Sequence, residues 1–168
     1  MERKYEVILY GATGFTGQLC AEYLGETYPD LKWAIAGRNK EKLESVKKKF
    51  SLSCDIFVAN GSDLEGLRNF VSQTKVVAST AGPFARYGSK LVEACVLEGA
   101  HYCDSTGETH WIKELIECHH EKAKKKGLRI VPSCGYDSVP SDLGRVSQVI
   151  AEYSHTCAIK EDQTVACW

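Results

Sequence analysis

A glycine-rich loop close to the start of the chain constrains its fold most strongly. The loop is Gly11-Ala12-Thr13-Gly14-Phe15-Thr16-Gly17, and it directly follows the apolar run Val7-Ile8-Leu9-Tyr10. Such a run is typical of a buried strand, and the residues after the loop have the spacing of a helix. Glycines at a strand-to-helix turn let backbone N–H groups approach an anion, because no Cβ atom obstructs them. The loop therefore predicts a phosphate-binding turn.

The rest of the chain alternates short strand-like runs with longer amphipathic stretches. Five further strands are predicted, at residues 33–36, 55–58, 76–79, 101–103 and 129–131. Strands separated by helices indicate repeated βαβ units and a parallel sheet that is covered on both faces. We therefore predict an α/β fold, a doubly wound parallel sheet of the Rossmann type with strand order 3-2-1-4-5-6. In such a sheet the ligand crevice lies outside the carboxyl ends of the strands.

Helix-capping signals place several helix starts. Asn39 precedes an amphipathic stretch and is predicted to cap it. Ser62 and Glu65 have the spacing of a capping box, in which each side chain satisfies the other's free backbone N–H. The helix after the glycine loop has Leu19 and Tyr23 among its apolar positions.

The residues after the second predicted strand indicate the cofactor. NAD-preferring sites usually place an Asp or Glu there to bind the ribose 2′-hydroxyl. This chain has Arg38 followed by Asn39. Because a guanidinium group can pair bidentately with a 2′-phosphate, we predict NADP(H), with Arg38 and Asn39 in its site. One alternative interpretation stays open for each feature. Arg38 could be a solvated surface charge, and the glycine loop could be an ordinary βα turn.

Composition and spacing exclude several other classes of protein. A formal net charge of -1 gives no basic excess for nucleic acid, and no apolar run has the length of a transmembrane segment. The charged first residues run straight into a strand, so no signal or transit peptide is expected. The eight cysteines and five histidines show no metal-ligand spacing, so we predict no metal site and reduced thiols in a cytoplasmic protein.

The sequence identifies no catalytic acid or base. The only Tyr with Lys four residues later is Tyr28 with Lys32, before the second strand and at the sheet end opposite the cofactor. Cys103 and Cys134 lie near the predicted crevice, where a small buried hydrophobe is the commoner role. Polar side chains also follow strands five and six, and turn or cap chemistry explains them as well as catalysis does. They are Asp104, Glu108, Tyr136, Asp137 and Asp142.

Five segments carry a family resemblance. They are VILYGATGFTG at 7–17, AIAGRNKEKL at 34–43, STAGPFARYGSKLVEAC at 79–95, HYCDSTGE at 101–108 and PSCGYDSVPSDLG at 132–144. With them the chain resembles the N-terminal NADP-binding domain of the saccharopine dehydrogenase-like oxidoreductases, a family that includes bacterial trans-acting enoyl reductases. The resemblance implies hydride transfer between a nicotinamide cofactor and a small-molecule or lipid-related substrate. It also implies membrane or lipid-droplet association of full-length relatives.

The same resemblance implies further cofactor-binding residues. Asp63 is expected near the adenine. The segment Thr80-Ala81-Gly82-Pro83-Phe84 is expected to line the cofactor, with its last four residues toward the nicotinamide end.

The C-terminal part departs from this family. We predict a nucleotide-binding domain at residues 1–144 and a divergent tail at 145–168, without the large substrate domain of the family. Residues 154–168 resemble part of one regulator-of-chromosome-condensation repeat, which predicts a loose hairpin or disorder. By contrast, helical spacing is found at Val146, Val149, Ile150 and Tyr153. A genuine short product and a truncated or fused gene both remain open. The alternative function is a truncated, non-catalytic nucleotide-binding fragment that acts as a sensor or interaction module.

Overall fold

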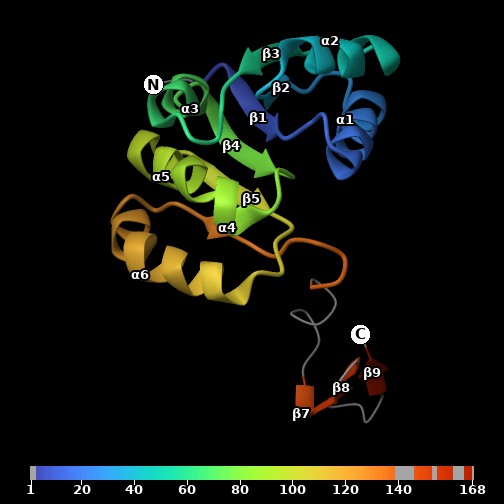
Figure 1. Cartoon of the computed structure of the whole chain (residues 1–168), viewed down its shortest axis with the longest axis vertical. Helices are drawn as coiled ribbons and strands as arrows, with labels where there is room; N and C mark the ends of the chain where they lie inside the picture. Colours follow the sequence, from blue (N-terminus) through green and yellow to red (C-terminus); the bar gives the residue numbers. More distant parts are fainter. Residues whose placement is uncertain (1–2, 139–145, 153–154, 161–164, 168) are drawn as a thin grey trace.

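A six-stranded parallel sheet forms the centre of the domain (Figure 1). The computed structural model describes residues 3–138, 146–152, 155–160 and 165–167, and it describes side chains within 3–138. The strands are β1 (Tyr5–Tyr10), β2 (Trp33–Gly37), β3 (Asp55–Val58), β4 (Thr74–Ser79), β5 (His101–Asp104) and β6 (Ile130–Val131). Their order is β3-β2-β1-β4-β5-β6. The predicted doubly wound sheet and its strand order are therefore confirmed.

Helices cover both faces of this sheet. They are α1 (Phe15–Thr27), α2 (Lys40–Lys49), α3 (Leu64–Val71), α4 (Phe84–Tyr87), α5 (Ser89–Glu98) and α6 (Thr109–Lys125). Helices α1 and α2 pack on one face, and α3, α5 and α6 pack on the other (Figure 1). Right-handed crossovers in both directions from β1 produce this division.

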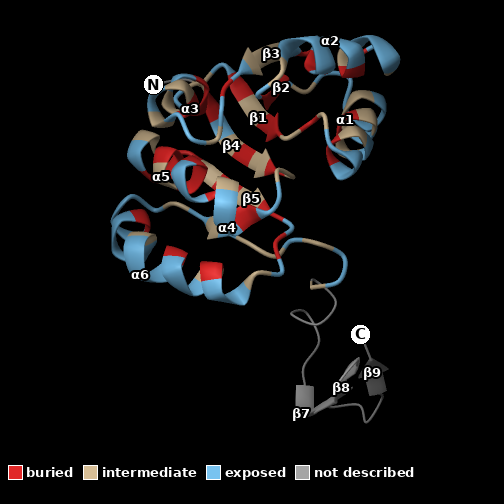
Figure 2. Ribbon diagram, in the orientation of Figure 1, coloured by how far each residue is buried: buried red, intermediate tan, exposed pale blue. Residues whose placement is uncertain are grey.

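Two buried clusters result, one on each face of the sheet. Alternate residues of β1 point to opposite faces, so Ile8 and Tyr10 join the cluster under α3, α5 and α6, whereas Leu9 joins the other. Figure 2 shows the buried residues concentrated in the strands and on the inner sides of the helices. Burying an apolar side chain of this size stabilises the fold by roughly 1.5–3 kcal/mol. The sheet is therefore a rigid platform, and its carboxyl edge carries the loops.

The helix caps agree with one prediction and correct another. Asn39 caps α2, since its Oδ1 accepts a hydrogen bond of 2.8 Å from the Lys42 N–H. The capping box of Ser62 and Glu65 is wrong: Asp63 caps α3 and accepts from the Gly66 N–H at 3.2 Å. An Asp at this position reaches the third helical amide by itself, which moves the helix start one residue along. Glu65 instead pairs with Arg68, at 2.8 Å.

The packing face of α1 is made by its small residues. Gly17 and Ala21 are its buried positions, whereas Leu19 and Tyr23 are 51% and 57% exposed. A Cβ atom on Gly17 would overlap the carbonyl oxygen of Gly11. The small side chains bring α1 close to the glycine loop. Leu24 packs partly buried against the core, whereas Phe15, Leu19 and Tyr23 face outward.

A second, three-stranded antiparallel sheet contains β7 (Val146–Glu152), β8 (His155–Lys160) and β9 (Val165–Cys167), in that order. The helical spacing of Val146, Val149 and Ile150 was therefore a misleading signal, because these residues lie in a strand that pairs with β8. Backbone pairing with a neighbouring strand overrides a weak helical period.

Candidate cofactor-binding site

A cavity of about 210 Å³ lies at the carboxyl ends of β1, β2, β3 and β4. We call it the cofactor cavity. Its walls are Tyr10, Gly11, Thr13, Gly14, Gly37, Arg38, Asn60, Gly61, Thr80, Ala81, Gly82 and Tyr87. These residues come from the ends of four neighbouring strands and the segments that follow them, and the strand order reverses between β1 and β4. This is the place where doubly wound sheets bind their ligands.

Gly11 is required by the backbone itself. Its φ of +91° lies in the left-handed region, and a Cβ atom there would lie 2.8 Å from the Ala81 nitrogen. The loop after β1 therefore approaches the loop after β4 more closely than any side chain would allow. The Thr80 hydroxyl donates to the Gly11 carbonyl oxygen at 3.2 Å and joins the two loops.

Gly14 has a different role, because nothing in the fold requires a glycine there. Its φ of −75° suits any residue, and the nearest atom to an added Cβ would be the Gly11 oxygen at 3.5 Å. Gly14 precedes α1, and no side chain caps this helix, whereas Asn39 and Asp63 cap α2 and α3. The first amides of α1 thus keep free hydrogen-bonding capacity beside the cavity. These amides and the open space at Gly14 fit a phosphate group, which a Cβ atom on residue 14 would obstruct.

Arg38 supplies the cationic wall of the cavity. Its side chain is exposed, and it forms no salt bridge and no side-chain hydrogen bond with any residue that the structure describes. It lies close to the Tyr10 phenol: burial raises the pKa of Tyr10, and the positive charge of Arg38 partly offsets this effect. A guanidinium without a protein partner is available to an anionic ligand.

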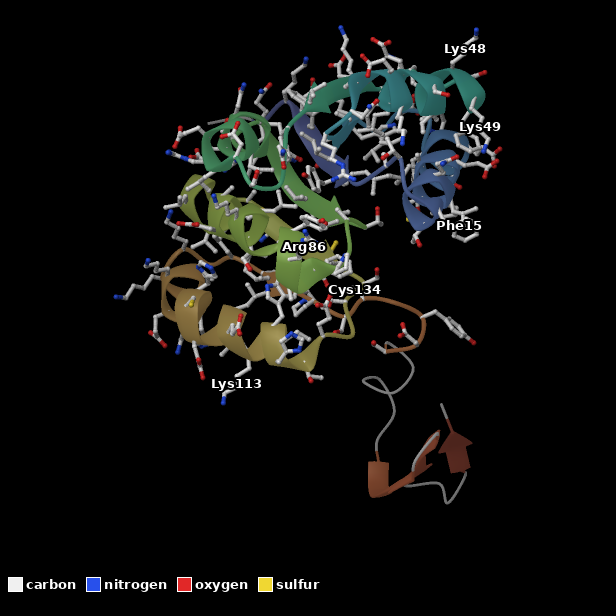
Figure 3. The ribbon with its side chains drawn as sticks, viewed as in Figure 1. Phe15, Lys48, Lys49, Arg86, Lys113 and Cys134 are labelled. Carbon is white, nitrogen blue, oxygen red and sulfur yellow. The ribbon has the colours of Figure 1, made fainter. Side chains whose placement is uncertain are left out.

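The other predicted cofactor residues divide into two groups. Thr13, Thr80, Ala81 and Gly82 line the cavity with Gly11, Gly14 and Arg38. The remaining ones lie outside its lining. Ala12 and Gly17 are buried, Thr16 and Pro83 are exposed, and Asn39 and Asp63 cap helices. Phe15 is 83% exposed and points away from the sheet (Figure 3), while Phe84 is buried against Trp111 with ring centroids 5.9 Å apart.

Several cavity residues were missed by the sequence analysis. Tyr10 is the last residue of β1, and its hydroxyl donates to the Ala59 carbonyl at 3.3 Å. Asn60 and Gly61 follow β3, so the predicted crevice at the carboxyl ends of the strands includes their position, although neither was assigned to the cofactor. Tyr87 ends α4, and no pattern in the sequence indicates that this helix returns to the cavity.

The polar residues after β5 form a structural network. The buried Asp104 carboxylate accepts hydrogen bonds from the Tyr102 hydroxyl at 2.7 Å, the Thr106 N–H at 3.0 Å and the Ser133 N–H at 3.1 Å. Burial raises the pKa of the Cys103 thiol to about 11 and also raises that of Cys134, so neither is poised as a thiolate nucleophile.

Tyr136 does not line the cofactor cavity. Tyr136 is 93% exposed, and Asp142 lies outside the described residues. Within the same part of the chain, no group of three or more His, Cys, Asp or Glu side chains is placed to hold a metal ion. None of its helices has the length and hydrophobicity needed to span a bilayer.

The fold and the cofactor cavity together define a doubly wound dinucleotide-binding domain. Residues 7–131 match the family profile of the saccharopine dehydrogenase NADP binding domain. The chain belongs to this family, and NADP is the cofactor of the domain. The predicted family and cofactor are thus confirmed.

The chain is also similar in sequence to mycobacterial proteins. The chain is 41% identical over 144 residues to a putative trans-acting enoyl reductase of Mycobacterium tuberculosis, covering 84% of the chain and 34% of that protein. It is 40% identical over 145 residues to a trans-acting enoyl reductase of Mycobacterium leprae, covering 84% and 35%. The chain thus spans about a third of the length of the curated relatives it matches.

The apo saccharopine dehydrogenase (L-Glu forming) of Saccharomyces cerevisiae has the same fold. Its TM-score is 0.68 at 16% identity, over 86% of this chain and 33% of that one.

Proposed function

We propose that this domain holds NADP(H) for hydride transfer in an oxidoreductase, and that the residues of the cofactor cavity orient it. One observation carries the proposal. The N-terminus of α1 at Gly14, which no described side chain caps, and Arg38, which has no partner among the described residues, border the same cavity. The first attracts a pyrophosphate, and the second pairs with a 2′-phosphate.

The cavity suggests how each part of the cofactor would lie. Gly11, Thr13 and Gly14 would hold the pyrophosphate, and Arg38 the phosphate on the adenosine ribose. Ala81 and Gly82, after β4, would lie toward the other nucleotide. The bound cofactor supplies or accepts the hydride, and the protein contributes orientation and electrostatics.

The substrate class in this proposal is an enoyl compound, lipid-related ones included. Its support is the name trans-acting enoyl reductase, which several relatives carry. A direct test follows the absorbance of NADPH while the purified chain is mixed with a short α,β-unsaturated acyl thioester. We expect oxidation of NADPH that depends on the thioester and is lost in the Gly14→Val variant.

A binding module without turnover is the second candidate. The titratable side chains in the described lining of the cavity are Tyr10, Arg38 and Tyr87, with no carboxylate or imidazole among them. Such a lining favours binding over acid–base chemistry. Tight NADPH binding without any thioester-dependent oxidation would select this second function over hydride transfer.

We further propose that residues 1–144 form the functional unit and that residues 145–168 are a separate tail. The likeness of residues 154–168 to part of one regulator-of-chromosome-condensation repeat supports this division. Such repeats form the blades of a β-propeller and depend on neighbouring blades, which one partial repeat lacks. Among the residues that the structure describes, those that line the cofactor cavity lie between Tyr10 and Tyr87.

A further inference from the structure

Glu108 lies at the start of α6, but its carboxylate does not cap that helix. Oε1 accepts a hydrogen bond of 2.6 Å from the Phe84 N–H, and Oε2 accepts one of 3.2 Å from the Ala85 N–H. These two amides open α4, which follows β4. Both oxygens of one carboxylate thus clamp the loop after β4 to the loop after β5.

The clamp is anchored in the sheet. The Glu108 N–H donates to Thr106 Oγ1 at 3.1 Å, and the Thr106 N–H donates to Asp104 Oδ1 at 3.0 Å. Asp104 and Thr106 are 4% and 1% exposed, and Asp104 ends β5. Because Asp104 and Thr106 are buried, these two hydrogen bonds fix the position of the Glu108 backbone. The Glu108 side chain therefore extends from a fixed point.

An apolar contact between α4 and α6 also holds the Phe84 residue in place. Trp111, one turn into α6, stacks on Phe84 and donates from Nε1 to Ser89 Oγ at 2.9 Å. Trp111 is fully buried and belongs to the core. The core therefore holds the ring of Phe84, whereas Glu108 holds its backbone, next to Pro83 and the cavity residue Gly82.

The clamped loop borders one particular half of the cofactor. A doubly wound sheet binds one nucleotide of a dinucleotide over each half of its carboxyl edge. Arg38 follows β2, so in the proposed binding mode the adenosine half with its 2′-phosphate would lie over β2 and β3. Ala81 and Gly82 follow β4 and line the cavity, on the side where the second nucleotide would lie. Glu108 itself is absent from the cavity lining and acts only through this loop.

We propose that Glu108 is a positioning residue for the nicotinamide half of the cofactor, because its carboxylate fixes the Ala81–Gly82 wall through the amides of Phe84 and Ala85. This inference rests on the proposed binding of NADP(H). The two hydrogen bonds satisfy the carboxylate within the protein, so its charge is not directed at the ligand.

The test compares a whole cofactor with half of one. We measure the dissociation constants of NADPH, by fluorescence titration, and of 2′,5′-ADP, by calorimetry, for the parental chain, Glu108→Ala and Glu108→Gln. Glu114→Ala is the matched control, since it removes an exposed carboxylate from the same helix. Hydrogen exchange at the Phe84 and Ala85 amides reports on the clamp itself.

We expect Glu108→Ala to weaken NADPH binding about tenfold and to change 2′,5′-ADP binding by less than about twofold. Glu108→Gln keeps one acceptor oxygen, so it should lie between Ala and the parental chain, and it carries the test alone if Glu108→Ala does not fold. The Phe84 and Ala85 amides should exchange faster in both variants, and Glu114→Ala should behave as the parent.

Two results would overturn the role of Glu108 alone. One is parental NADPH affinity in a folded Glu108→Ala protein. The other is an equal loss of NADPH and 2′,5′-ADP, which would show that Glu108 supports the domain as a whole. A parental chain that binds neither ligand would instead overturn the proposed function, and this inference with it.

Discussion

Gly14 and Gly17 lie three residues apart in the glycine loop, yet the structure gives them different reasons to be glycine. A Cβ on Gly17 would overlap the Gly11 carbonyl oxygen and lie 2.8 Å from the Ala12 Cα, whereas Gly14 has room for one. We therefore predict that Gly14→Val remains folded and loses NADPH binding. Circular dichroism and fluorescence titration check the two parts of this prediction.

The Gly17→Val variant is the control for that experiment. It should lose stability, because its side chain would push α1 away from the loop. A folded Gly14→Val protein with parental NADPH affinity would show that the pyrophosphate lies elsewhere.

At the scale of single residues, the sequence predicted those parts of the cofactor cavity that depend on local chain geometry. The glycine loop and Arg38 follow strands directly, so their place at the carboxyl edge could be predicted. The return of Tyr87 to the cavity and the role of Glu108 could not be predicted in this way. Their roles depend on contacts between segments that lie far apart in the sequence, such as the hydrogen bond from Phe84 to Glu108.

At the scale of elements, apolar runs between turns identified all six strands of the parallel sheet and their order. The packing face of α1 and the cap of α3 were harder to predict. In α1 the apolar residues surround the helix, so periodicity does not reveal that Gly17 and Ala21 face the sheet. In α3 both Ser62 and Asp63 are good caps, and only the loop geometry selects Asp63.

Arg3 joins two helices at their C-termini. Its guanidinium donates to the carbonyl oxygens of Val71 and Ser72, at the C-terminal end of α3, and of Glu98 and Gly99, at the C-terminal end of α5. A cation at two helix C-termini also complements both helix dipoles. We expect Arg3→Ala to lower the free energy of unfolding by roughly 2–3 kcal/mol. Thermal unfolding should show a drop in Tm of roughly 5–10 °C.

The neighbouring Lys4→Ala variant is the control. Lys4 pairs with Asp55 at 3.0 Å, but both side chains are more than half exposed, and such a solvent-screened pair adds little to stability. If Arg3→Ala and Lys4→Ala lower Tm equally, the junction at Arg3 does not stabilise the domain as we describe.

At the scale of the whole molecule, the buried clusters that the structure describes lie in the N-terminal domain. Both buried clusters consist of residues between Tyr5 and Ile130. We predict that deletion of residues 154–168 changes Tm by less than about 2 °C and leaves NADPH affinity unchanged. A large loss of Tm in this deletion would show that the tail stabilises the domain and that the boundary near residue 144 is misplaced.

The central claim is that one cavity binds NADP(H) through the glycine loop and Arg38. Its most direct test is a fluorescence titration of the purified chain with NADPH and with NADH, repeated for Arg38→Ala. We predict that the parental chain prefers NADPH by about ten- to hundredfold and that Arg38→Ala removes this preference by weakening NADPH binding alone. Equal affinity of the parental chain for both cofactors, or an equal loss of both in Arg38→Ala, would contradict the account.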